Sequence, residues 1–290
     1  MSNRRAIVKR RKSVRNIKKI TRTMQLIATA RFQAAMNRAV ASRPYVDKLA
    51  ELVGELAGAA GDYRHPLLEA PDSDRSLLLV LSSNRGLAGG YNAHLLRAAM
   101  EHTDALAAEG VATDTWMVGK KGISAYRFRG REIAAKHTRF DDKPRFEQVE
   151  PLARDAMHRF TSGGVGSVYA AYMRFHSAGR QAPEVARLLP LATGAAGEGD
   201  AATPSNYEIR PSAPVVLDRL LPATVRMRLY QAFLDAAVSE QIFRMTAMKA
   251  ATEAADDTIK DLTRQYNRAR QTAITLELLD IVGGANALSG

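Results

Sequence analysis

Apolar residues near the N-terminus recur at steps of three and four, which is the spacing of one face of a helix. The stripe consists of Ile17, Ile20, Met24 and Ile27, and alanines continue it. Small side chains let a second helix approach closely, so this stripe predicts a helical partner. Neither proline nor glycine occurs before Pro44, which is expected to interrupt or kink this helix.

A second stripe near the C-terminus follows the 4-3 spacing of a coiled coil. Its members fall in two registers, first Leu229, Phe233, Ala236, Glu240, Phe243, Ala247, Ala250 and Ala254, then Leu262, Tyr266, Ala269, Ala273 and Leu276. A period of 3.5 residues predicts a left-handed coiled coil. Pro222 is expected in the first turn of this helix, and Gly283-Gly284 at its end.

The middle of the chain alternates between short apolar runs and helical patterns. Strands are predicted at Ser76–Ser82, Thr115–Val118, Glu132–Lys136 and Ser167–Met173, and helices at 93–108 and 146–160. Strands that alternate with helices predict a largely parallel, Rossmann-like α/β sheet. The fold class is therefore α/β plus a long coiled coil.

Four segments follow from these patterns. We expect an N-terminal coiled-coil helix at 1–60, a central α/β domain at 75–192, a connector loop at 193–212 and a C-terminal coiled-coil helix at 213–290. The connector is rich in Gly, Ala, Ser and Pro and has no periodicity. The sequence contains no apolar run of about 18 residues, so no membrane-spanning helix is predicted, and no secretory signal is predicted either.

Net charge is concentrated at one end of the chain. The protein carries +12 overall, and residues 1–46 hold 13 Lys and Arg and no acid, so the remainder sums to −1. Nucleic-acid binding through such a basic helix is the alternative function. A mitochondrial transit peptide is also basic, but it would normally be richer in serine. The apolar stripe inside the arm favours a helical partner over a free basic arm.

The sequence offers only weak candidates for a catalytic, cofactor-binding or metal site. The glycine-rich turn at 83–92 matches neither a P-loop nor a dinucleotide fingerprint and is interpreted as a structural turn. Gly119–Gly122 is interpreted as an exposed turn. Cysteine is absent, and the six histidines lack metal-site spacing. The sequence therefore predicts no catalytic, cofactor-binding or metal site, and an enzyme on the α/β domain is the weakest alternative.

Several motifs, in the same order along nearly the whole chain, resemble the gamma subunit of F-type ATP synthases. They are Ser13–Ala28, Ser42–Tyr45, Arg85–Gly90, Arg244–Ala251, Tyr266–Thr275 and Ile281–Ala285. The sequence departs from the usual family pattern at Ile17, Thr23, Leu26, Ala88 and Leu276. These departures bear on how strongly the chain is expected to couple to its partner subunits. They leave the family resemblance itself intact.

The resemblance implies an antiparallel coiled coil that stands inside the alpha3-beta3 catalytic hexamer. It also implies an α/β domain that contacts the membrane rotor ring of c subunits and the small epsilon subunit. The chain would transmit torque and catalyse nothing itself, without cofactors and without spanning the membrane. Its expected location is peripheral, on the cytoplasmic face of a bacterial plasma membrane.

Residues that match family positions in contact with the catalytic subunit are expected on both terminal helices. They are Thr21, Arg22, Met24, Arg244, Arg270, Gln271 and Thr275. Arginine suits such contacts because its guanidinium binds carboxylates through two parallel hydrogen bonds. An antiparallel pairing further predicts that cysteines placed near Ile20 and Ala269 form a disulfide at some register.

Overall fold

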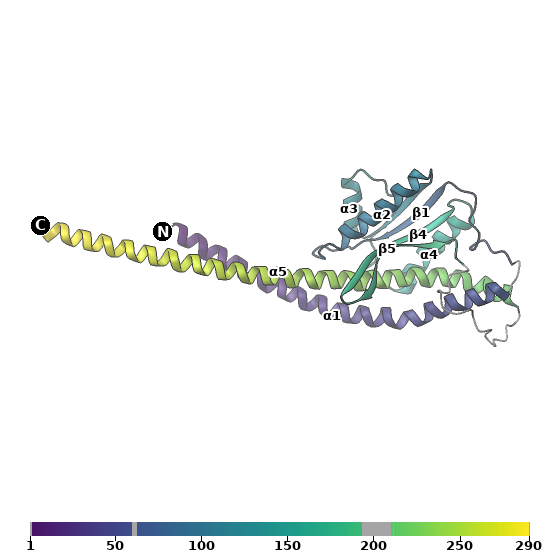
Figure 1. Cartoon of the computed structure of the whole chain (residues 1–290), viewed down its shortest axis with the longest axis horizontal. Coiled ribbons are helices and arrows are strands. Elements are labelled where there is room, and N and C mark those ends of the chain that lie inside the picture. Colours follow the sequence, from purple (N-terminus) through teal and green to yellow (C-terminus); the bar gives the residue numbers. More distant parts are fainter. Residues whose placement is uncertain (1, 60–62, 193–209, 211, 290) are drawn as a thin grey trace. The chain divides into compact units, whose positions relative to one another are not determined.

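The computed structural model describes residues 2–59, 63–192, 210 and 212–289. Two compact units emerge, one from Met1–Ala28 with Arg244–Gly290 and one from Thr29–Phe243, and each is described by itself. The long helices α1 (Ser2–Ala59) and α5 (Ala213–Ser289) contribute residues to both units (Figure 1).

Five strands in the second unit form one sheet in the order β3-β2-β1-β4-β5. The central strand β1 (Arg75–Leu81) is parallel to β2 (Ala112–Val118) on one side and to β4 (Ser167–Ser177) on the other. At the edges, β3 (Ala135–His137) is parallel to β2, and β5 (Arg180–Leu189) is antiparallel to β4. Because both faces of β1 are covered, its side chains from Ser76 onward are all buried.

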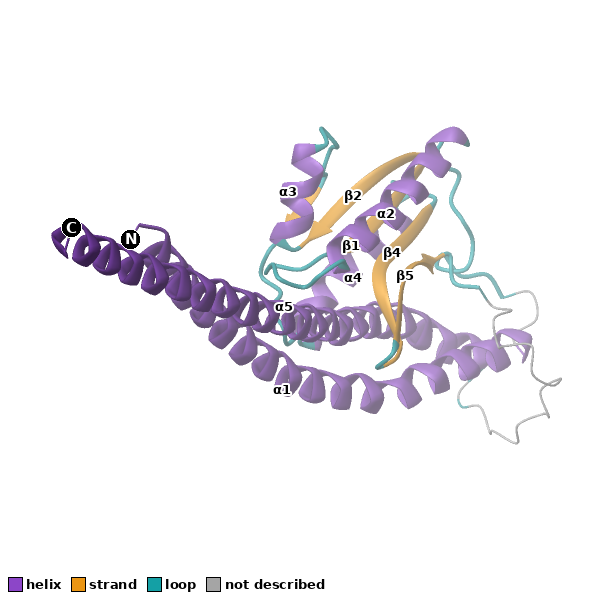
Figure 2. Cartoon of the chain, turned by 60° about the vertical axis from the view of Figure 1, so that its left-hand side comes forward, coloured by secondary structure: helices purple, strands orange, loops and turns teal. Residues whose placement is uncertain are grey.

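Helices cover both faces of this sheet (Figure 2). Leu78 and Val80 pack on one face with α2 (Tyr91–Ala108) and α3 (Lys120–Phe128). On the other face, the apolar core includes α4 (Phe146–Thr161) and the part of α5 within the second unit. The chain is therefore α/β with a long helix pair, which confirms the predicted fold class.

Two elements of the sheet domain were missed by the sequence patterns. The segment interpreted as an exposed turn at Gly119–Gly122 begins α3, and Gly122 is buried. A Cβ on Gly122 would lie only 2.3 Å from Met117 Sδ, so glycine is required by close packing and does not mark an exposed turn. Strand β5 contains Pro183, which is tolerated because this strand forms an edge of the sheet.

The local signals at Pro222 and Gly283-Gly284 were misread, and Pro44 does not interrupt its helix. Helix α1 continues through Pro44 to Ala59. Helix α5 begins at Ala213, so Pro222 lies inside it, and it continues past Gly283-Gly284 to Ser289. Around the two prolines, buried residues such as Ala39, Leu49 and Leu217 keep the helices packed, and tertiary packing outweighs local propensity. The predicted connector at 193–212 lies almost wholly outside the described residues.

Candidate functional site

In the first unit, α1 and α5 run antiparallel (Figure 1). The Oγ1 atoms of Thr21 and Thr252 lie 2.8 Å apart, and Lys18 donates a hydrogen bond to Asp256. Further along, the Arg11 guanidinium lies 5.1 Å from the ring centroid of Tyr266. Along the pair, residue numbers decrease on one helix as they increase on the other, and these three contacts define the register of the pair.

Contact positions on each helix follow a 4-3 spacing. On α1 they are Ile7, Arg11, Val14, Lys18, Thr21, Gln25 and Ala28, and on α5 they are Met248, Thr252, Ala255, Ile259, Leu262, Tyr266, Ala269 and Ala273, all at least partly buried. Such spacing is typical of a left-handed coiled coil. The α1 side contains mostly polar and small residues, so the pair depends on hydrogen bonds and ion pairs as well as on apolar contact.

The apolar stripe predicted to face a partner helix within the chain does not do so. Ile17, Ile20 and Ile27 are 51%, 59% and 48% exposed. The helix contacts α5 through the neighbouring stripe, where the smaller Thr21 and Ala28 allow closer approach. Met24 lies at the margin and is half-buried.

On α5 the second predicted register is confirmed up to Ala273, whereas the end of the first is wrong. Ala250 and Ala254 are exposed, and Met248 and Ala255 are buried instead. Alanines occupy several faces of this stretch, so spacing alone does not identify the buried one.

A strongly apolar segment lies at the end of α5, beyond the start of α1 (Figure 1). Its exposed aliphatic side chains are Ile274 at 47%, Leu276 at 56%, Leu278 at 57%, Leu279 at 61%, Ile281 at 68% and Val282 at 55%. They cover more than half of the helix circumference, with the exposed acids Glu277 and Asp280 on the remaining side, which breaks the 4-3 pattern. That break is the sequence signal that could have identified this surface.

Basic side chains surround the exposed stripe of α1. Lys12, Arg15, Lys19 and Arg22 line a shallow depression on the helix pair, together with Lys18 and Asp256. The hydrogen bond from Lys18 lowers the pKa of Asp256, so this acid remains ionised and partnered. The surface as a whole suits a partner with acidic side chains next to apolar ones.

The predicted partner-contact residues divide into accessible and buried groups. Arg22, Arg270, Gln271 and Thr275 are exposed, Met24 is half-buried, and Thr21 and Arg244 are 9% and 6% exposed. Arg22 donates a hydrogen bond to Gln25 Oε1 at 3.0 Å and keeps its position on the outer face. The structure thus brings Thr21 to the contact between the two helices and leaves four residues free to meet a partner.

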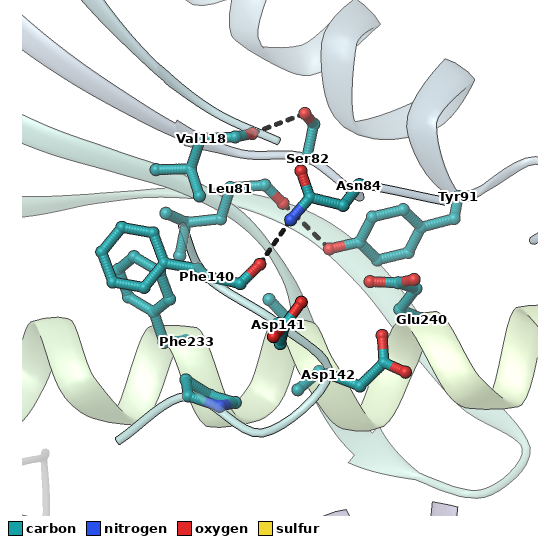
Figure 3. Close-up of a pocket in the computed structure, with 13 residues that line it drawn as sticks. Leu81, Ser82, Asn84, Tyr91, Val118, Phe140, Asp141, Asp142, Phe233 and Glu240 are labelled. Carbon is teal, nitrogen blue, oxygen red and sulfur yellow. Dashed lines mark hydrogen bonds between the residues drawn. The ribbon is translucent and has the colours of Figure 1, made fainter. Parts of the chain in front are cut away.

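The carboxyl end of the sheet, where α/β folds usually bind ligands, is filled by side chains (Figure 3). Tyr91 donates to the Leu81 carbonyl at 2.9 Å, and Ser82 donates to the Val118 carbonyl at 2.6 Å. The rings of Phe140 and Phe233 pack 4.7 Å apart. The remaining cavity is about 40 Å³.

The turn at 83–92 is held by its own hydrogen bonds, as a structural turn requires. The backbone N–H of Ser83 donates to Asn92 Oδ1 at 3.1 Å, and Ser83 Oγ donates to the Arg85 carbonyl at 2.7 Å. Within the described residues, His, Asp and Glu form no cluster suited to a metal ion. The same part of the chain contains no helix with a stretch apolar enough to cross a membrane.

Comparison with known proteins decides the family. A sequence model described as ATP synthase matches residues 3–288. The ATP synthase gamma chain of Rhodopirellula baltica is 43% identical over 298 aligned residues and covers 100% of both chains. That of Frankia casuarinae is 42% identical and covers 97% of this chain and 96% of its own. The chain belongs to the ATP synthase gamma chain family.

Chains in solved structures of ATP synthases share the fold of this chain. A chain in the OSCP/F1/c-ring structure of the Euglena gracilis mitochondrial ATP synthase superposes with a TM-score of 0.67, at 17% identity and over 99% of this chain and 95% of that one. A chain in the central stalk/c-ring structure from Tetrahymena thermophila gives 0.55 at 20% identity, over 80% of this chain and 99% of that one. None of these relatives supports the nucleic-acid alternative.

Proposed function

We propose that this chain is the rotating shaft of an ATP synthase and that it catalyses no reaction itself. In this role it transmits torque between a membrane ring of c subunits, driven by ion flow, and the alpha3-beta3 catalytic hexamer. A small epsilon subunit is the third proposed partner. The proposed location is peripheral, at the cytoplasmic face of a bacterial plasma membrane.

One observation carries this proposal: the helix pair keeps a large apolar and basic outer surface exposed after its own contacts are made. Ile17, Ile20 and Ile27 remain accessible although α1 already has a helical partner. Exposed aliphatic side chains in such number mark a surface that another protein covers.

The two ends of this surface suit different contacts. Around Arg22 it is basic, which favours acidic segments of the catalytic subunits. Around Leu279 most of the surface is apolar, with Glu277 and Asp280 on the remaining side, which suits an enclosing collar that is mainly apolar and can slide. We propose direct partner contacts for Arg22, Met24, Arg270, Gln271 and Thr275, and a positioning role for the buried Thr21 and Arg244.

Rotation follows from asymmetry in this arrangement. A single helix pair inside a threefold ring presents a different face to each catalytic subunit. Different contacts favour different conformations of those subunits, and turning the shaft changes which subunit adopts which conformation.

A bead-rotation measurement tests the proposal. The chain has no cysteine, so a Glu101→Cys variant carries a single thiol on the exposed face of α2 for bead attachment. With the catalytic hexamer fixed to a surface and ATP supplied, we expect the bead to rotate in one direction. Beads attached to a fixed catalytic subunit serve as the control and should not rotate. ATP hydrolysis at the normal rate with a stationary bead on the introduced thiol would overturn the proposal.

A further inference from the structure

A groove of about 750 Å³ lies within the second unit, between α1, α5 and the β4–β5 hairpin. Four arginines line it, namely Arg43, Arg174, Arg187 and Arg228. Three acids, Asp47, Glu184 and Asp235, line it as well. The groove is therefore rich in charge, and the pairing of these charges determines what else it can bind.

Glu184 and Asp235 are fully engaged by groups of the groove. Arg174 binds both carboxylate oxygens of Glu184 at 3.1 and 2.9 Å, and the Tyr172 hydroxyl donates to the same carboxylate at 3.0 Å. Asp235 accepts a hydrogen bond from Gln231 at 2.9 Å and lies 3.6 Å from Arg43. These two acids and two arginines neutralise each other and leave no charge to be compensated.

Arg228 and Arg187 have no counter-anion in the part of the chain that the structure describes. Among the described residues, neither side chain forms a hydrogen bond or an ion pair, and the exposed Asp47 forms none with them. Arg228 is half-buried, and burial lowers the pKa of its guanidinium with no acid to oppose the shift. A guanidinium that is partly withdrawn from water with no anion nearby is unfavourable, which makes this position unusual in a folded protein.

We propose that this groove binds a phosphate group, with Arg228 at its inner wall and Arg187 on the exposed strand β5 as the two ligands. A phosphate carries a charge of about −1.5 to −2 at neutral pH and three acceptor oxygens, which matches two unpaired guanidinium groups. Arginine binds such groups through two parallel hydrogen bonds. The groove volume falls within the range of small-molecule sites and leaves space beyond the phosphate for the rest of a phosphorylated compound.

Inorganic phosphate and ADP are the two probes, because either free phosphate or a phosphorylated compound could supply the group. The full-length chain is titrated with each and followed by thermal unfolding, with NaCl at matched ionic strength as the blank. For inorganic phosphate, line broadening in the ³¹P spectrum reports binding directly. At ten times the Kd, we expect the midpoint to rise by about 3 °C above the NaCl blank.

The variant Arg228→Gln should weaken binding at least about tenfold, because a charge-assisted pair of hydrogen bonds is lost. Its unfolding midpoint without ligand should equal or exceed that of the wild type, since a half-buried charge without a counter-anion among the described residues is removed. This second readout separates a lost ligand site from a damaged fold. Arg187→Gln, on the exposed strand, should weaken binding with no change in fold.

Arg97→Gln is the matched control. Arg97 is exposed on α2, on the other face of the sheet, and has no hydrogen bond or ion pair among the described residues. It should bind phosphate as the wild type does. A response to ADP alone would identify the ligand as a phosphorylated compound and would support the site. Equal stabilisation of the wild type and Arg228→Gln, or no effect of either probe beyond NaCl, would overturn it.

Discussion

At the scale of single residues, two hydroxyl groups occupy the centre of the helix pair. Thr21 and Thr252 are each 9% exposed, and their Oγ1 atoms share a hydrogen bond. Each also lies near a backbone acceptor on its own helix, the Lys18 carbonyl at 3.1 Å and the Met248 carbonyl at 2.7 Å; the two hydroxyl hydrogens can serve two of these three contacts at a time. A polar pair in a coiled-coil core favours one register over others at some cost in stability.

Replacing one or both threonines by valine should have effects that do not add. Thr21→Val alone should lower the free energy of unfolding of the helix pair by about 1 kcal/mol, because the Thr252 hydroxyl keeps its backbone acceptor but loses the hydrogen bond across the pair. The double variant with Thr252→Val should return close to the wild-type value, since two apolar side chains of the same shape then face each other. Urea unfolding followed by helical circular dichroism measures both. A double variant that loses the sum of the two single effects would contradict the structure.

At the scale of elements, the sequence predicted which segments form helices and strands better than it predicted which faces they bury. The apolar run at 76–82 and the strand–helix alternation were sufficient for the parallel part of the sheet. The N-terminal helix carries two adjacent stripes, one of large aliphatics and one of small and polar residues, and the larger one was expected to be buried. Its exposure is understandable only when the chain is part of a larger assembly.

The antiparallel register of α1 and α5 can be trapped covalently in this cysteine-free chain. Thr21→Cys with Thr252→Cys should oxidise to an intramolecular disulfide, because these two side chains already touch. The pair near Ile20 and Ala269 suggested by the sequence should not, since Ile20 faces outward and Ala269 lies near the level of Arg11. Mobility on non-reducing gels distinguishes the two double variants. A bridge in the second pair and none in the first would refute this register.

At the scale of the whole molecule, charge and apolar surface are distributed unequally between the two units. Residues 1–46 hold the net positive charge, and the exposed apolar segment follows Ala273 at the other end of the chain. The position of the candidate surface was predictable in part. The family resemblance predicted contact positions at four residues that the structure shows to be exposed, namely Arg22, Arg270, Gln271 and Thr275. The aliphatic segment and the Arg228 side chain, which has no partner among the described residues, could be recognised only from the burial and pairing of side chains in the structure.

The isolated chain should self-associate through the apolar segment at 274–282. Leu278→Ser with Leu279→Ser removes two of its exposed side chains and should shift the protein toward monomer in light scattering after size-exclusion chromatography, because less apolar surface remains to be covered. Thr272→Ser, an exposed change about two turns before Leu278 on the same helix, is the control. Unchanged self-association of the double variant would show that a different surface mediates it.

The pairing of Thr21 with Thr252 joins positions 231 residues apart. During synthesis at about 5 to 20 residues per second, α1 waits about 10 to 50 s before its partner leaves the ribosome. Throughout that interval its contact face is uncovered, and a strongly apolar face would invite aggregation. The α1 face that contacts α5 carries Lys18 and Thr21, so during that interval it adds little apolar surface to the aliphatic stripe that α1 exposes in any case.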